Sequence, residues 1–268
     1  MNKKVVIITG ASSGIGLACA REFSNHGFKV VMAARNIEKL LEIVQELKQS
    51  NPDIIAVQTD VSLETDCKKM IDETIVHFGR IDILINNAGV SMRALFKDID
   101  LKVIHTVMNT NFWGTVYCTK YALPHILLQK GSVVGISSIA GYMGLPGRTG
   151  YSASKFAIQG FLETLRIEHL KQGLHVMIAA PGFTTSNIRK SALSSNGTML
   201  GTSPRDENKM MSAEKVAQYI YRGIAKRKRQ TLLTLQGKLA LLLKRCFPQI
   251  IDHLEYLEMK KEPNSPLI

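Results

Sequence analysis

The chain is short of cysteine, of aromatic residues and of long apolar runs, and these shortages exclude several classes of protein. It has 268 residues and four cysteines, which are scattered without a Cys-x-x-Cys pair. This pattern suits a reducing compartment such as the cytoplasm and provides no disulfide framework and no zinc site. No apolar run approaches the roughly 18 residues that span a bilayer. The apolar stretch at residues 5–8 is too short for a signal peptide.

Acidic residues are also scarce relative to basic ones. The 34 lysines and arginines outnumber the 22 acidic residues, which gives a formal net charge of +12. Such an excess favours an anionic partner: a nucleotide phosphate, an acidic membrane surface or a nucleic acid. Hydrophobic residues make up 45% of the chain and charged residues 21%, so a globular protein with a sizeable core is expected.

Short apolar runs alternate with helical patterns along the chain. Buried strands are predicted at residues 5–9, 29–34, 54–58, 83–85, 132–136 and 176–180. Helical patterns lie between them, including residues 37–48 and about 64–78, where Gly79 ends the helix. This alternation predicts an α/β, three-layer, doubly wound parallel sheet, the Rossmann fold. Ligands bind such a sheet at the carboxyl ends of its strands.

A glycine-rich turn, Thr9-Gly10-Ala11-Ser12-Ser13-Gly14-Ile15-Gly16, joins the first strand to a helix. Glycine allows a pyrophosphate to meet bare amides at a helix N-terminus, so the turn indicates a dinucleotide site. The second strand ends at Ala34-Arg35, with a guanidinium in place of the acid that would hold a ribose diol. This favours a 2′-phosphate and hence NADP(H), with NAD(H) as the alternative; Arg35 could also merely solvate a strand end. Asp60 and Val61 follow the third strand, where an adenine edge would lie.

Tyr151 and Lys155 are four residues apart, so both side chains leave the same face of a predicted helix. A phenol titrates near 10 and a lysine near 10.4, so neither alone suits proton transfer at neutral pH. A nearby ammonium would lower the pKa of Tyr151. Ser138 follows the strand at 132–136 and places a hydroxyl at the same edge of the sheet. The bland alternative is a solvated lysine beside a half-buried ring.

Together with Asn86-Asn87-Ala88-Gly89 and Pro181-Gly182, these motifs resemble those of the short-chain dehydrogenase/reductase family, in the family's order, from residue 3 to about 235. The resemblance implies a catalytic set of Asn111, Ser138, Tyr151 and Lys155. Tyr151 would be the acid/base, and Ser138 would bind the carbonyl oxygen. Lys155 would hold the nicotinamide ribose, and Asn111 would anchor a water in a proton path. The expected cofactor-binding residues are Gly10, Ser12, Ser13, Gly14, Ile15, Gly16, Arg35, Asp60, Val61, Asn87, Ala88, Gly89, Tyr151, Lys155, Pro181, Gly182 and Thr184.

Two of these predicted site residues, Thr184 and Asn111, have unusual sequence surroundings. Thr184 departs from the family pattern, which has an aliphatic residue there, and this puts the detailed nicotinamide contacts in doubt. Asn111 lies among poor interior helix residues, so a local irregularity is expected; without the resemblance it could be a satisfied core asparagine. Pro124 predicts a kink further along that helix. No histidine pair or carboxylate cluster suggests a metal, and the chemistry requires none.

The helix after Tyr151 and the segment after residue 186 carry predictions about oligomerisation and substrate access. The helix after Tyr151 is apolar over more than half its circumference, which favours a homodimer or homotetramer; cover by the C-terminal extension is the alternative. Residues 187–211 are polar and irregular and are predicted to be a small substrate lid with Met210 and Met211 as an apolar wall, or else a plain surface loop. Ser212 is expected to cap a helix running to about residue 225.

The tail is basic and rich in leucine. A catalytic domain is expected over residues 1–235 and an apolar, basic extension over 236–268. No acidic residue lies between Glu214 and Asp252, which favours peripheral contact with an anionic membrane. The leucines could instead close the active site or pack on a neighbouring subunit. Residues 262–266 are expected to be frayed.

The predicted function is an NADP-dependent oxidoreductase that interconverts a ketone and a secondary alcohol on a hydrophobic substrate: a lipid, a steroid or an acyl chain. One alternative is a reductase of 3-oxoacyl chains on acyl carrier protein. Another is a non-catalytic NADP-binding sensor. Nucleic acid is the least favoured partner, because the basic residues lie beside leucines and not beside stacking aromatics.

Overall fold

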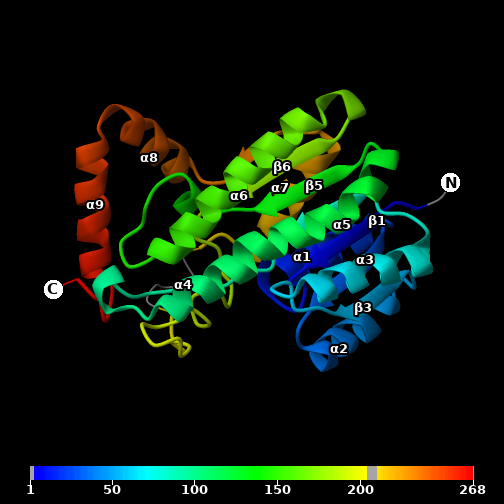
Figure 1. The fold of residues 1–268 in the computed structure, drawn as a ribbon, viewed down its shortest axis with the longest axis horizontal. Coiled ribbons are helices and arrows are strands. Elements are labelled where there is room, and N and C mark those ends of the chain that lie inside the picture. Colours follow the sequence, from blue (N-terminus) through cyan, green and yellow to red (C-terminus); the bar gives the residue numbers. More distant parts are fainter. Residues whose placement is uncertain (1–2, 204–209, 268) are drawn as a thin grey trace.

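A seven-stranded, fully parallel sheet forms the middle layer of the protein (Figure 1). The computed structural model describes residues 3–203 and 210–267. Within these residues the strand order is β3-β2-β1-β4-β5-β6-β7. The strands are β1 (Val5–Thr9), β2 (Lys29–Ala34), β3 (Ile54–Gln58), β4 (Ile83–Asn86), β5 (Ser132–Ile136), β6 (His175–Ala180) and β7 (Gln230–Leu232). The predicted doubly wound sheet is confirmed, and the short edge strand β7 is an addition that the sequence pattern did not indicate.

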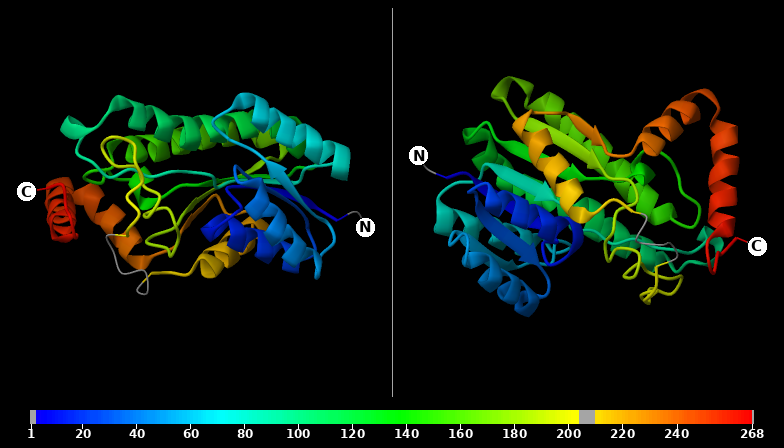
Figure 2. Two further views of the ribbon diagram at one scale, coloured as in Figure 1. Left: turned by 90° about the horizontal axis from the view of Figure 1, so that it is seen from below. Right: turned by 180° about the vertical axis from the view of Figure 1, so that it is seen from behind.

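Helices cover both faces of the sheet (Figure 2, left). One face packs against α1 (Gly14–Asn25), α2 (Ile37–Lys48) and α7 (Ala213–Ala225). The other packs against α3 (Glu64–Phe78), α5 (Gly114–Leu128) and α6 (Thr149–Glu168). Helix α4 (Leu101–Met108) continues into α5 through a π-helical turn, and short 3₁₀ helices lie at Phe96–Asp98, Ile139–Gly141 and Leu170–Gln172. These two helical layers enclose the sheet, so its buried strands read as apolar runs in the sequence.

Local capping explains several helix boundaries. Asn36 accepts a hydrogen bond from the Lys39 amide at the start of α2, and Ser212 accepts one from the Lys215 amide at the start of α7. Helix α3 ends at Gly79, whose φ of 73° lies in the left-handed region that favours glycine. The predicted cap at Ser212 and the predicted end at Gly79 are therefore confirmed.

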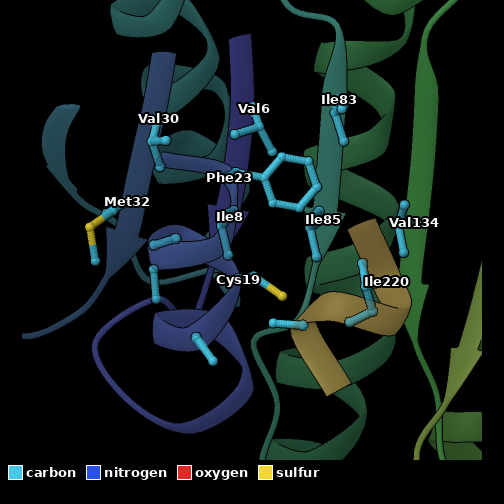
Figure 3. Close-up of a cluster of buried hydrophobic side chains, with 14 of the residues drawn as sticks. Val6, Ile8, Cys19, Phe23, Val30, Met32, Ile83, Ile85, Val134 and Ile220 are labelled. Atoms are coloured by element: carbon cyan, nitrogen blue, oxygen red, sulfur yellow. The ribbon is translucent and has the colours of Figure 1, made fainter. Parts of the chain in front are cut away.

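The larger hydrophobic core lies between the sheet and the layer of α1, α2 and α7 (Figure 3). Phe23 of α1 is fully buried there, between the side chains of β1 and β4 and Ile220 of α7. Its ring makes edge-to-face contacts with Phe28 and Tyr221, at centroid distances of 5.1 and 5.5 Å. This packing holds α1, and hence the glycine-rich turn that precedes it, against the sheet.

Two C-terminal helices extend the molecule beyond the sheet. Helix α8 (Leu235–Cys246) leaves the β7 edge, and α9 (Pro248–Lys261) runs along the end of the molecule opposite α2 (Figure 1). The Glu262 carboxylate, which is buried, lies 3.2 Å from the Arg93 guanidinium. The prediction of a fraying end is therefore wrong for Glu262, because this ion pair anchors it. Among the described residues, no helix is both long and apolar enough to cross a membrane.

Candidate active site

Tyr151 and Lys155 lie in the first turns of α6, against the carboxyl end of β5. Both side chains are buried. The Lys155 Nζ atom donates a hydrogen bond of 2.7 Å to the Ile136 carbonyl and lies 5.7 Å from the centroid of the Tyr151 ring. The helical spacing in the sequence thus places the phenol and the amine side by side, at the edge of the sheet where ligands bind.

The electrostatics of this pair differ from the sequence prediction. Burial raises the pKa of Tyr151, and this outweighs the lowering by a hydrogen bond with Ser138 and by the charges of Arg148 and Arg189. Burial lowers the pKa of Lys155 to about 8. The expected lowering of the Tyr151 pKa by Lys155 is not found. Lys155 donates its hydrogen bond to the Ile136 carbonyl, and desolvation disfavours its charged form.

Ser138 is placed by a short turn that follows β5. Its Oγ accepts a hydrogen bond of 3.2 Å from the Ala140 amide, which caps the 3₁₀ helix at Ile139–Gly141. The same hydroxyl is hydrogen-bonded to the Tyr151 side chain. Two hydroxyl groups from different elements therefore meet at one point, where they could bind a single oxygen atom.

Asn111 sits in the π-helical turn Asn109–Trp113, which confirms the predicted irregularity. Its Oδ1 accepts from the Val90 amide at 2.8 Å, and its Nδ2 donates to the Val90 carbonyl and to Ser154 Oγ. A Cβ on Gly89 would lie 3.1 Å from Asn111 Oδ1 and 3.7 Å from Lys155 Nζ, so both side chains converge on Gly89. Asn111 ties the Val90 backbone to α6, and its role in holding a water stays a prediction.

The glycine-rich turn is folded tightly on the loop after β4. A Cβ on Gly16 would lie 2.3 Å from the Gly10 carbonyl oxygen, so no other residue fits there. Asn87 Nδ2 donates to the carbonyls of Thr9 and Gly10, and the Asn87 and Ala88 amides both donate to Thr9 Oγ1. Ser13 starts α1 without a side-chain cap, which leaves the first amides of the helix for an anion. This cradle fits the pyrophosphate of a dinucleotide.

Arg35 lies near the same turn. The Ala11 amide donates to the Ala33 carbonyl at 3.1 Å, which brings the turn against the end of β2, two residues before Arg35. The Arg35 side chain is exposed, and in the described part of the chain no ion pair engages it. The guanidinium is thus available to a phosphate beside the turn.

Asp60 and Val61 have structural contacts of their own. Asp60 Oδ1 accepts from the Ser62 amide and hydroxyl at 2.9 and 2.7 Å. Val61 is buried and packs on Gly114, where a Cβ would lie 2.8 Å from Val61 Cγ2. These contacts hold the loop after β3 in place, and contact with an adenine stays a prediction for both residues.

The loop after β6 reaches back to the glycine-rich turn. It carries Pro181 and Gly182, and a cavity of about 290 Å³ at the first turn of α1 is lined by Gly14 from one side and by Thr185 and Ser186 from the other. Thr184 is buried, and its carbonyl accepts from the guanidinium of Arg189 at 2.6 Å. The loop therefore lies where a bound dinucleotide would meet it.

The predicted lid is described in part, since residues 204–209 lie outside the described ranges. Leu193 forms isolated β-bridges to Met92 and Met199. Met211 packs against the main hydrophobic core and bridges Thr184. Met211 therefore supports the core in this structure, and the substrate wall of Met210 and Met211 stays a prediction.

Sequence reasoning missed several residues of this site. Thr9 is the hydrogen-bonding centre of the glycine-rich turn, and Ser154 joins Asn111 to α6. The charges of Arg148 and Arg189 act on Tyr151. A hydroxyl at the carboxyl end of a buried strand was a usable signal for Thr9. Arg189 lies 38 positions from Tyr151 within an irregular segment, so no spacing rule indicates it.

Comparison with known proteins agrees with this geometry. A family model described as short chain dehydrogenase matches residues 4–197. The chain belongs to this family. Among curated relatives, it is 39% identical over 254 residues to 11-beta-hydroxysteroid dehydrogenase-like 2 of Arabidopsis thaliana, covering 94% of this chain and 80% of the relative. It is 38% identical over 260 residues to 11-beta-hydroxysteroid dehydrogenase-like 3 of the same plant, covering 95% and 81%.

Two solved structures are also similar to this short-chain dehydrogenase. One is a short chain dehydrogenase/reductase from Burkholderia phymatum in complex with NAD, with a TM-score of 0.81 and 25% identity, covering 100% of this chain and 98% of the other. The other is an alcohol dehydrogenase from the archaeon Thermococcus sibiricus, complexed with 5-hydroxy-NADP, with a TM-score of 0.76 and 22% identity, covering 86% and 96%. As a family member, the protein is an oxidoreductase that acts on CH–OH groups of a small-molecule substrate with a nicotinamide dinucleotide as cofactor.

Proposed function

We propose that the protein is an NADP(H)-preferring oxidoreductase that interconverts a ketone and a secondary alcohol on a hydrophobic substrate, with Tyr151 as the acid/base. The observation that carries the proposal is the hydrogen-bonded pair of Ser138 and Tyr151, with Lys155 directly beside the phenol. The pair lies at the carboxyl edge of the sheet, next to the glycine-rich cradle. Serine and tyrosine hydroxyls that meet at one point can bind one substrate oxygen from two directions.

The side chains divide the proton chemistry among them. A bound nicotinamide dinucleotide would supply the hydride chemistry. Ser138 would donate a hydrogen bond to the substrate carbonyl oxygen and so favour the negative charge that develops on it. Tyr151 would give its proton to that oxygen. Because burial raises the pKa of Tyr151, the phenol is protonated at neutral pH, which is the form that reduction needs.

Lys155 and Asn111 would support the reaction from fixed positions beside the site. Lys155 is held by the Ile136 carbonyl, and its depressed pKa of about 8 allows it to lose and regain a proton near neutral pH. It would restore the Tyr151 proton and hold the ribose of the cofactor. Asn111 fixes Val90 and Ser154 around this lysine. Together with Gly89, these residues form the floor of the proposed nicotinamide site.

The preference for NADP(H) rests on Arg35. Its exposed guanidinium follows β2 beside the glycine-rich turn, where no carboxylate could hold a ribose diol. A paired titration of NADPH and NADH, followed by nicotinamide fluorescence, tests this on the wild type and on Arg35→Ala. We expect tighter binding of NADPH in the wild type and similar, weaker affinities in the variant. Equal affinities in the wild type would refute the role of Arg35 and leave the protein without a preference between NADP(H) and NAD(H).

The substrate class follows from composition and from the relatives. The curated relatives carry the name 11-beta-hydroxysteroid dehydrogenase, and the C-terminal helices α8 and α9 add apolar surface near the proposed site. Both observations favour a steroid or a comparable lipid over a small polar alcohol. Two alternatives are a reductase of acyl-carrier-protein-bound 3-oxoacyl chains and a non-catalytic NADP-binding sensor. An activity assay with several substrate classes separates them.

The test compares wild type with Tyr151→Phe and Ser138→Ala. NADPH oxidation is followed with a panel of keto-steroids, long-chain ketones and 3-oxoacyl-carrier-protein. Loss of the phenolic proton should lower kcat by about 10²–10⁴ while NADPH binding persists. If only the carrier-bound substrate reacts, the substrate proposal is wrong. If no substrate reacts and Tyr151→Phe behaves like wild type, the protein is a sensor.

We also propose a homo-oligomer that forms through α5 and α6. Large apolar side chains are exposed on these two helices and on the π-helical turn that precedes α5: Trp113, Leu128, Phe156 and Ile167. Such a surface favours a second copy of the chain. Light scattering should give a dimer or tetramer for wild type and a smaller species for Phe156→Glu. A monomeric wild type would refute the proposal.

A further inference from the structure

Helices α8 and α9 each carry exposed apolar side chains. In α8, Leu239, Leu242, Leu243 and Cys246 follow the spacing of one helical face, and all four are exposed. Phe247, which joins the two helices, and Ile250 and Leu254 of α9 are exposed as well, and these seven side chains together are called the stripe. Leu242 is 63% exposed, and Ile250 is 58% exposed. Seven side chains of this kind on two successive helices are more than scattered surface apolar residues.

The opposite side of α9 packs against the rest of the protein. Ile251 and Met259 are buried, and Met259 packs so closely on Gly147 that a Cβ there would lie 2.7 Å from Met259 Cε. The buried Arg93–Glu262 ion pair fixes the end of the helix. The inner side of α9 is therefore already in use, and the exposed stripe is free to meet another surface.

Charge beside the stripe indicates what that surface is. Arg245 is exposed on the flank of the α8 face, Lys261 is exposed near the line of Ile250 in the last turn of α9, and α8 contains no acidic residue. At about 100° per residue, Asp252 and Glu255 lie on the side of α9 away from Ile250, whereas the exposed Glu258 lies on the flank of the stripe, one turn after Leu254. Basic residues that border an apolar stripe complement an anionic lipid surface.

We propose that the stripe formed by Leu239, Leu242, Leu243, Cys246, Phe247, Ile250 and Leu254 docks the protein on the surface of an anionic lipid bilayer. The apolar side chains enter the boundary between headgroups and acyl chains, and the neighbouring lysines and arginines contact the headgroups. A second copy of the chain fits this stripe less well. A two-fold interface sets the same patch against itself and would bury the exposed Arg245 of both copies at its edge, with no acidic residue in α8 to pair with it.

The position of the stripe also matters. Helix α9 and its end contact Gly147 and Arg93, which belong to the loops that follow β5 and β4. A bilayer under α8 and α9 would thus lie at the substrate end of the sheet and away from α2 and α3.

Co-sedimentation of the full chain with lipid vesicles tests the proposal. We use phosphatidylcholine vesicles with and without phosphatidylglycerol and vary the salt concentration. Wild type should bind the anionic vesicles, bind the neutral ones weakly, and dissociate as salt rises. Leu242→Ser and Ile250→Ser should each weaken binding roughly ten-fold, because each removes one apolar anchor. Arg245→Gln should weaken it about five-fold.

Matched controls separate this surface from general effects. Val76→Ser removes an even more exposed apolar side chain from α3, and Lys171→Gln removes an exposed cation from the 3₁₀ helix at Leu170–Gln172. Both should bind vesicles like wild type, and circular dichroism and thermal unfolding should show every variant folded. Equal binding to neutral and anionic vesicles, or equal losses in the controls, would refute the proposal. So would an absence of vesicle binding together with an oligomer, seen by light scattering, that Leu242→Ser dissociates; the stripe would then serve a second copy.

Discussion

Replacing Lys155 with methionine should change how the stability of the protein depends on pH. Lysine in an unfolded chain titrates near 10.4, whereas burial lowers the pKa of Lys155 in the folded protein to about 8. Between these values the unfolded chain binds more protons than the folded one. The free energy of unfolding of wild type should therefore rise as the pH rises through this interval.

The magnitude follows from the same two values. At pH 7 both states hold the proton, and the charged form costs the folded state about 3 kcal/mol. Between pH 7 and about pH 9.5, roughly 2 kcal/mol of that cost should disappear. Lys155→Met removes the cost at every pH but also loses the bond to the Ile136 carbonyl, worth about 1.5–3 kcal/mol. The two effects nearly cancel at pH 7, so the pH dependence of the difference is the informative quantity.

Urea unfolding of both proteins at pH 7 and pH 9.5 measures this quantity. We expect wild type to gain about 2 kcal/mol on Lys155→Met between the two pH values, while the variant loses catalytic activity. Other titrating groups are common to both proteins and cancel in the comparison. Parallel pH profiles would show that the Lys155 pKa is not depressed, and the proposed proton exchange between Lys155 and Tyr151 near neutral pH would fall with it.

Three other predictions follow from the packing and the charges. Arg189→Met removes a positive charge that lowers the pKa of Tyr151, so the basic limb of the pH–rate profile for reduction should move to higher pH; an unmoved limb would contradict this. Phe23→Ala should lower the free energy of unfolding by about 3–5 kcal/mol, as measured with urea, whereas Val76→Ala, on the exposed side of α3, should change it by less than about 0.5 kcal/mol. Arg93→Met takes from the buried Glu262 its ion-pair partner, so hydrogen exchange should accelerate in α9 ahead of the sheet; uniform exchange would argue against local docking by this pair.

Much of the fold could be predicted because its determinants are local. Apolar runs alternate with amphipathic helices, and each helix boundary carries its own residue, such as Ser212 or Gly79. The glycine-rich turn and the four-residue spacing of Tyr151 and Lys155 are local in the same sense. Such patterns identify the parallel sheet, the cradle and the shared helix face without knowledge of any distant contact.

The parts that were missed depend on contacts between distant residues. The strand β7 has three residues, too few for a clear pattern, and it forms because β6 offers an open edge. Arg93 and Glu262 are 169 positions apart, so their ion pair could not be expected from the sequence. The expectation of a fraying end failed for this reason.

The amino-acid sequence by itself determined which chemistry the protein carries: a glycine-rich cradle, a serine after β5, and a tyrosine and lysine on one helical face. Only the tertiary structure decided the protonation of that chemistry. The pKa of a phenol or an amine depends on how much water and which charges surround it, and these come from elements far apart in the chain. Here burial raises the pKa of Tyr151 and lowers that of Lys155, whereas spacing alone suggested that the lysine would lower the pKa of the tyrosine.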